Sequence, residues 1–196
     1  MLKEVVGDIA MMESVQSGRP IREMNAQLQR LPHWLEYNAA LIRTVEGGVP
    51  PFEGRYINYV RRVPLGVVGQ ITPWNHPLLI ALKKAAPALS AGNCVVCKPS
   101  ELAPCSVLEF AAILSAAGVP DGVFNVVPGL GAVAGNALCA SPRIKKLDIT
   151  GGTATGKVVG AMAGGNLAHF TAELGGKAPV IVFEDVVQNG IFFKFL

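Results

Sequence analysis

After Gly66 the sequence alternates between short apolar segments and longer segments with helical spacing, and this rhythm constrains the fold most. Strands are expected over residues 67–72, 93–98, 123–127, 144–149, 169–173 and 180–183. Helices are expected between them, over residues 78–90, 104–117, 132–140 and 153–163. Strands that alternate with helices of about ten to fifteen residues indicate right-handed crossovers. The sequence therefore predicts an α/β fold with a doubly wound, mostly parallel sheet.

The first third of the chain is expected to be helical and then extended. Apolar residues near helical spacing predict helices over residues 1–17 and 21–45, with Pro32 as a break in the second. Glycine and proline over residues 47–51 predict a linker. β-branched and aromatic residues then alternate with polar ones over residues 56–63, which predicts an extended arm.

The composition is unusually apolar, with 51% hydrophobic and 16% charged residues. It is typical either of a membrane protein or of the buried interior of a larger globular one. The longest apolar runs are interrupted, at Lys83-Lys84 and at Gly164-Gly165, so we expect no membrane span. The start has no basic segment followed by an apolar run, so we expect no secretion. Parallel strands covered on both faces give a similar composition, which favours the buried interior.

The net charge of +3 is mild, and the distribution of basic residues argues against a nucleic-acid-binding surface. The basic residues occur in scattered pairs without interleaved aromatic residues. We interpret the pairs as solvated faces: Arg61-Arg62, Lys83-Lys84 and Lys145-Lys146.

Cys94 and Cys97 fit the C-x-x-C spacing of redox and zinc sites. They lie in an expected strand, however, where residues three apart point to opposite faces, and the sequence has no second pair to complete a zinc site. We therefore expect structural thiols, with a redox role as the remote alternative. Cys105 begins an expected helix and is interpreted as structural too. Free thiols are typical of a cytoplasmic protein.

Two glycine-rich segments follow expected strands and open expected helices. Gly129-Leu-Gly131-Ala-Val-Ala-Gly135 is near the dinucleotide fingerprint, and Asp148 lies about twenty residues on, where an acid that binds ribose is expected. The alternative is a tight turn that needs small residues. Gly151-Gly152-Thr-Ala-Thr-Gly156 offers backbone N–H groups to an anion in the next unit.

Lys98 stands at the carboxyl end of an expected strand, with Glu101 three residues later. A lysine can bond a ribose hydroxyl or a phosphate, and a carboxylate accepts from a 2′-hydroxyl but repels a 2′-phosphate. A solvent-facing loop pair is the alternative.

Four motifs in this order and at these separations resemble the aldehyde dehydrogenase superfamily. They are Pro73-Trp74-Asn75-His76-Pro77, Lys98-Pro99-Ser100-Glu101, Gly151 to Gly156, and Glu173-Leu-Gly-Gly-Lys177. The likeness runs from about residue 2 to residue 185, well under half of a typical family member. The resemblance implies a Rossmann-like fold. Together with the sequence pattern it leads us to expect a helical segment over residues 1–49, a linker and extended β arm over 50–65, a dinucleotide-binding domain over 66–185 and an atypical tail over 186–196.

The resemblance also implies residue roles in the NAD(P)+-dependent oxidation of a small-molecule aldehyde. Asn75 would donate to the oxyanion, and Glu173, helped by burial, would be the general base. Lys98 and Glu101 would hold the adenine ribose, favouring NAD+ while NADP+ stays possible. The arm over 56–63 resembles the family's oligomerisation hairpin, which implies a homo-oligomer. The residues expected to line the cofactor groove are Ile71, Trp74, Gly131, Gly135, Gly151, Gly152 and Leu174.

The sequence departs from the family pattern at its end. The family's nucleophilic cysteine lies downstream of the Glu173 motif, whereas no cysteine of this sequence follows Cys139. Residues 186–196 are aromatic and nearly uncharged, which suggests a chain cut or misread past Asp185. We expect this polypeptide to bind NAD+ in part without oxidising aldehydes; the alternative is a non-catalytic binding or interaction module. Asn75, Lys98, the glycine turns and Glu173 are expected to converge on one crevice.

Overall fold

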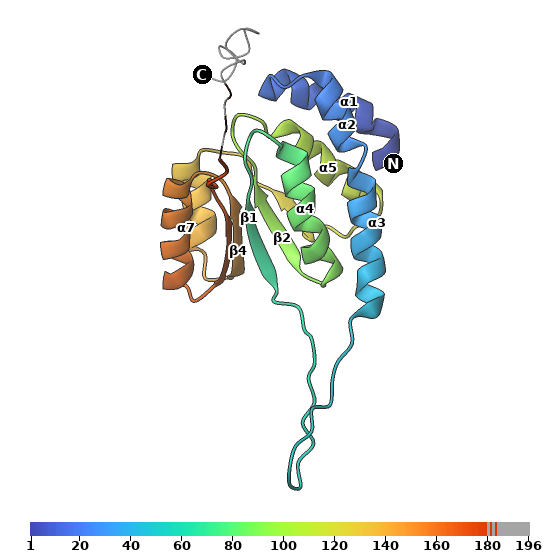
Figure 1. Cartoon of the computed structure of the whole chain (residues 1–196), viewed down its shortest axis with the longest axis vertical. Coiled ribbons are helices and arrows are strands. Elements are labelled where there is room, and N and C mark those ends of the chain that lie inside the picture. The colour runs from blue at the N-terminus through green and yellow to red at the C-terminus, as the bar shows by residue number, and fades with distance from the viewer. Residues whose placement is uncertain (180, 182, 184–196) are drawn as a thin grey trace.

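The computed structural model describes residues 1–179, 181 and 183. Its centre is a parallel sheet with the strand order β3-β2-β1-β4-β5 (Figure 1). The strands are β1 (Val67–Ile71), β2 (Cys94–Lys98), β3 (Phe124–Val126), β4 (Ile144–Thr150) and β5 (His169–Glu173). The predicted α/β fold with a parallel sheet is confirmed. The strand expected over residues 180–183 and the tail over 186–196 lie outside the described residues.

Strand β1 lies in the middle of the sheet, with β2 on one side and β4 on the other. The chain adds β2 and β3 on one side of β1 and then crosses to add β4 and β5 on the other. Ile71 is aligned with both Lys98 and Ile149, so the strands end at one common edge. A reversal of this kind is the switch point at which open α/β sheets bind ligands, outside the carboxyl ends of the strands.

Helices cover both faces of the sheet. α4 (Pro77–Ser90) and α5 (Cys105–Ala116) pack against β1, β2 and β3. On the other face, a π-helical turn (Gly131–Gly135) leads into α6 (Asn136–Ala140), and α7 (Thr153–Gly165) packs beside it against β4. Leu147 and Ile149 are buried against this second layer. The expected helices are therefore present, and the one over 132–140 begins as a π turn.

The N-terminal helices form a further layer on α4 and α5. They are α1 (Leu2–Ser17), α2 (Ile21–Leu28) and α3 (Leu31–Leu41), followed by a short 3₁₀ turn (Ile42–Thr44). Met24, Leu28 and Leu31 are fully buried in one cluster with residues of α4 and α5. The predicted break falls just before Pro32, which lies in the first turn of α3, where its missing N–H costs nothing.

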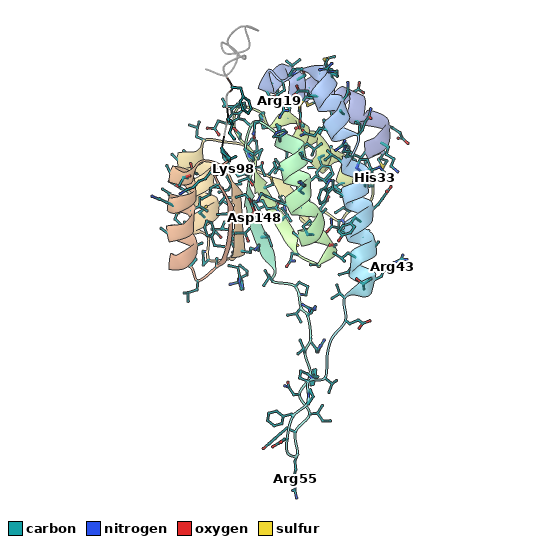
Figure 2. All side chains as sticks on the ribbon, in the orientation of Figure 1. Arg19, His33, Arg43, Arg55, Lys98 and Asp148 are labelled. Carbon is teal, nitrogen blue, oxygen red and sulfur yellow. The ribbon has the colours of Figure 1, made fainter. Side chains whose placement is uncertain are left out.

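Between the 3₁₀ turn and β1 the chain makes a long extended arm that projects away from the body (Figure 1). One antiparallel bridge, Gly48 to Val60, joins its two limbs, and Arg55 marks its far end (Figure 2). The arm is extended as expected, but within the described residues it forms no regular strand. A two-stranded ribbon with neither a third strand nor a core beneath it is marginal in water. Among the described residues, no helix has the length and apolar character needed to cross a bilayer.

Candidate functional site

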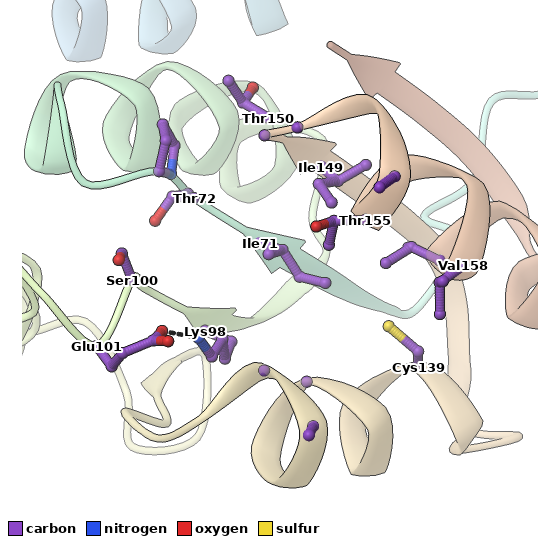
Figure 3. A pocket seen from close by; sticks show the side chains of 18 of the residues that line it. Ile71, Thr72, Lys98, Ser100, Glu101, Cys139, Ile149, Thr150, Thr155 and Val158 are labelled. Carbon is purple, nitrogen blue, oxygen red and sulfur yellow. Dashed lines mark hydrogen bonds and ion pairs between the residues drawn. The ribbon is translucent and has the colours of Figure 1, made fainter. Parts of the chain in front are cut away.

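A cleft of about 620 Å³ opens at the carboxyl edge of the sheet, at the switch point between β1 and β4. Its walls come from the ends of β1, β2 and β4, the π turn and the first turns of α7 (Figure 3). Among the residues predicted to hold a cofactor, those that line the cleft are Ile71, Trp74, Lys98, Glu101, Gly131, Gly135, Gly151 and Gly152. Leu174 does not line it. Ile71 and residues from three of the four family motifs and from the Gly129–Gly135 segment, spread over 82 positions (71 to 152), thus meet in one hollow.

Lys98 and Glu101 form an ion pair at this cleft. The Lys98 side chain is 5% exposed and its Nζ lies 2.9 Å from Glu101 Oε2, while the Glu101 side chain is 43% exposed. The pKa of Glu101 lies below its ordinary value, first because its own backbone N–H donates to the carboxylate and then because Lys98 does. The solvent-facing alternative is therefore wrong for Lys98, which is buried, while Glu101 remains exposed; both side chains border the cleft (Figure 3).

The glycines of the two predicted cradles differ in what the fold requires of them. Gly129 has a φ of 152°, and a Cβ there would lie 3.0 Å from Ala134 Cβ, so the turn itself requires glycine. At Gly131, Gly135 and Gly152 φ is not positive, and a Cβ would meet nothing within 4 Å. Packing therefore does not explain these three glycines, although all of them line the cleft. Bare backbone at these positions suits close approach by a ligand.

Helix α7 directs its N-terminus at the same cleft. Gly152 is its N-cap, with extended backbone, and no side chain caps the first turn. The Gly151 N–H already has a partner, because it donates to the Glu173 carbonyl oxygen at the end of β5, at 3.1 Å. The unpaired N–H groups of the first turn and the helix dipole favour an anion there. The hydroxyl of Thr155 also faces the cleft (Figure 3).

Asp148 does not lie in the cleft, so the role suggested by its spacing from the glycine loop is wrong. Successive side chains of β4 alternate between the two faces, and Ile149 faces α7 whereas Asp148 faces the α4 side. There its carboxylate pairs with Lys84 Nζ, and both side chains are largely buried. The interpretation of Lys83-Lys84 as a solvated face is therefore wrong for Lys84, which sequence reasoning missed because its partner is 64 residues away.

Asn75 and Glu173 lie at the same edge of the sheet, but outside this cleft. Asn75 is exposed and follows Trp74, which lines the cleft. Glu173 is exposed at the end of β5 and lines a neighbouring hollow of about 590 Å³ together with Leu174. Thr150 lines both hollows. The expectation of a single crevice is therefore wrong: the predicted residues divide between two adjoining hollows, and Asn75 lines neither of the two. Within the described residues, Glu173 lacks the expected burial.

The cysteines are free thiols in the structure. Cys97 is fully buried, and burial raises its pKa to about 12. Cys139 lines the cleft, but it is 1% exposed and burial raises the pKa of its thiol as well. Both therefore stay protonated near neutral pH, which agrees with the structural interpretation.

A family model described as "Aldehyde dehydrogenase family" matches residues 1–189 of the chain. The chain belongs to the aldehyde dehydrogenase family. It is 47% identical over 191 residues to acetaldehyde dehydrogenase 2 of Cupriavidus necator, a match covering 96% of the chain and 38% of that relative. It therefore spans well under half the length of this curated member.

Solved structures of family members superpose on the described fold. PnpE in complex with nicotinamide adenine dinucleotide is 42% identical, with a TM-score of 0.88, covering 94% of the chain and 38% of that protein. The NAD+ complex of aldehyde dehydrogenase from Bacillus cereus is 37% identical, again with a TM-score of 0.88 and coverage of 94% and 38%. These likenesses place the chain's Rossmann-like sheet among enzymes solved with NAD bound.

Proposed function

We propose that this chain is the cofactor-binding part of an enzyme that oxidises an aldehyde to a carboxylic acid with NAD+. The observation that carries the proposal is the Lys98–Glu101 ion pair in a cleft that also exposes the backbone of Gly131 and Gly152. A buried ammonium, a carboxylate and bare backbone at a helix N-terminus fit the hydroxyls and phosphates of a dinucleotide. The negative charge of Glu101 favours NAD+ over NADP+, since a 2′-phosphate would be repelled.

The same edge of the sheet carries the groups proposed to act on the aldehyde. The Asn75 amide would donate a hydrogen bond to the oxyanion, a preorganised contact that can lower a barrier by about 3 kcal/mol. Glu173 would accept a proton from the water that completes the acid. NAD+, when bound, accepts the hydride that the aldehyde loses. Balanced, an aldehyde, NAD+ and water give a carboxylic acid, NADH and a proton.

The family's reaction also needs a thiolate, and we propose that none of the thiols in this polypeptide supplies it. Cys139 is the cysteine that lines the cleft, and its raised pKa keeps it protonated. The 196-residue polypeptide by itself is therefore expected to bind NAD+ and to give no aldehyde-dependent absorbance at 340 nm. Turnover of an aldehyde by the purified polypeptide would contradict this assignment.

Calorimetric titration with NAD+ and NADP+ tests the cofactor site. We expect saturable binding of NAD+, weaker binding of NADP+, and a loss of about tenfold or more on Lys98→Met, since charge-assisted hydrogen bonds contribute about 1.5–3 kcal/mol. Lys145→Met is the matched control because Lys145 is exposed at the opposite end of β4. Glu101→Gln should reduce the ratio of the NADP+ dissociation constant to the NAD+ dissociation constant. Absence of binding at millimolar NAD+ would remove the proposal.

A non-catalytic module that joins copies or relatives through the extended arm is the second candidate. Tyr56 and Ile57 on the arm are 78% and 82% exposed, which is unusual for large apolar side chains and favours association, including a homo-oligomer. Co-elution with a full-length relative in size exclusion would support it. The free thiols favour a reducing compartment such as the cytoplasm.

A further inference from the structure

A buried carboxylate on α1 reaches the first turns of two other helices. Glu13 is fully buried, and its Oε1 accepts hydrogen bonds from Leu78 N–H and from the Ser106 hydroxyl, each at 2.7 Å. Leu78 lies in the first turn of α4 and Ser106 in the first turn of α5. Neither helix has a capping side chain at its own N-cap residue. Glu13 therefore caps α4 through the Leu78 N–H and ties α5 to it through the Ser106 hydroxyl.

Burying Glu13 has a cost that the fold offsets only in part, since among the described residues its buried Oε2 has no hydrogen-bond partner. Burial raises the pKa of Glu13, while the Ser106 hydroxyl, the Leu78 N–H and the nearby Arg19 charge act to lower it. Two helix N-termini that converge on one carboxylate favour its negative charge. A partly compensated buried charge is weak support for stability, but its bonds fix geometry at the start of α4.

Arg19, in the turn between α1 and α2, holds the loop that precedes α4. Its Nη1 donates to a ring nitrogen of His76 at 2.6 Å and lies 3.4 Å from the Asn75 carbonyl oxygen. Its Nη2 is anchored to Glu23 at 2.9 Å. Arg19 Nη1 also lies 3.0 Å from His76 Nδ1, and that ring nitrogen lies 2.9 Å from Gln27 Oε1. Contacts from two elements thus fix the backbone around Asn75.

We propose that Glu13 and Arg19 are positioning residues for the loop that carries Asn75. Glu13 fixes the first turn of α4, three residues beyond Asn75, and Arg19 fixes the loop backbone and the His76 ring. This inference rests on the proposed role of Asn75 as the oxyanion donor. A donor of that kind must be held within about 0.5 Å of its productive position, which an exposed loop without supporting contacts does not achieve.

Trp74 reports on this loop directly, because it is the neighbour of Asn75 and 50% exposed. The sequence has two tryptophans, so Trp34→Phe leaves Trp74 as the single tryptophan, which is excited selectively over the three tyrosines at the red edge of the absorption band. In that background we expect Arg19→Ala to raise the acrylamide quenching constant of Trp74 at least twofold and to speed its local anisotropy decay. Arg22→Ala, an exposed arginine in the first turn of α2, is the matched control and should leave both unchanged.

The Glu13 variants separate a lost hydrogen-bond acceptor from a lost charge. Glu13→Gln keeps an acceptor oxygen and should retain the parental quenching constant, whereas Glu13→Leu should raise it as Arg19→Ala does. If Glu13→Leu does not fold, the comparison of Arg19→Ala with its control Arg22→Ala still tests the inference. Unchanged Trp74 quenching in a folded Arg19→Ala variant overturns the inference. NAD+ titration of the parent is read separately, so failure of cofactor binding is distinguishable from failure of loop positioning.

Discussion

The charged side chains that are buried among the described residues each have a partner, and the partner's distance along the chain decides whether sequence reveals it. Lys98 pairs with Glu101, three residues away, so the motif contains both members. Lys84 pairs with Asp148, and Glu13 bonds residues 65 and 93 positions away. No local pattern identifies the distant partners. The sequence indicated Lys98 and Glu101 as ligand-binding candidates without predicting their ion pair, and sequence reasoning missed the partners of Lys84 and Glu13.

Glu13 makes stability depend on pH in a direction set by its pKa. In the folded chain, burial raises the pKa of Glu13 above its ordinary value of 4.5, so the folded state binds more protons than the unfolded state. This contribution is complete below pH 4.5 and is lost as pH rises through the folded pKa. We expect Glu13→Gln to flatten the fall in unfolding free energy with rising pH.

Chemical denaturation at a series of pH values from acid to neutral measures this slope. Glu4→Gln is the control, since the Glu4 side chain on the same helix is 79% exposed. Identical slopes for Glu13→Gln and the parent would show that Glu13 does not carry the pH dependence.

At the scale of elements, Gly69 allows the central strand β1 to pack closely against strand β4. A Cβ at Gly69 would lie 2.8 Å from Leu147 Cδ2 and 3.3 Å from Ile144 Cγ2, both on the neighbouring strand β4. Gly69→Val is therefore expected to overpack this contact and lower the free energy of unfolding by about 1–3 kcal/mol. The midpoint of urea denaturation measures the change.

Gly7→Ala gives the opposite expectation and serves as the control. Gly7 is an exposed position on helix α1, where a Cβ meets nothing within 4 Å. The substitution should stabilise the chain by about 0.4–1 kcal/mol, because alanine loses less backbone entropy on folding. Stabilisation by Gly69→Val would contradict the close approach of β1 and β4.

The sequence predicted which segments form helices and which form strands, but it did not predict their local geometry. The strand–helix rhythm predicted β1 to β5 and the helices between them, because each has a distinct apolar period. The π turn over Gly131–Gly135 was expected as ordinary helix, since a widened turn leaves no periodic signal. The arm was predicted as extended. The structure shows that its two limbs share one antiparallel bridge and that its described residues form no regular strand.

At the scale of the whole molecule, the arm is the part with the least internal support. It exposes Ile57 and Tyr59 far from the sheet and has a single bridge between its limbs. We expect the parent chain to self-associate in sedimentation velocity and Ile57→Asp to shift it toward the monomer. Asn58→Asp adds the same charge at an adjacent polar position and should have little effect. A monomeric parent at micromolar concentration would exclude the arm as an association surface.

The sequence by itself determined the parallel α/β sheet, the order of its elements and the residues at its carboxyl edge. These follow from local period and from the rule that parallel strands end together. Tertiary structure alone decided that Asp148 faces away from the cleft and that Glu173 lines the adjoining hollow. It also decided that Glu13 reaches the first turn of α4 and that Arg19 reaches the loop of Asn75. The physical reason is that strand alternation and helix packing join residues far apart in the chain, where no local pattern records the contact.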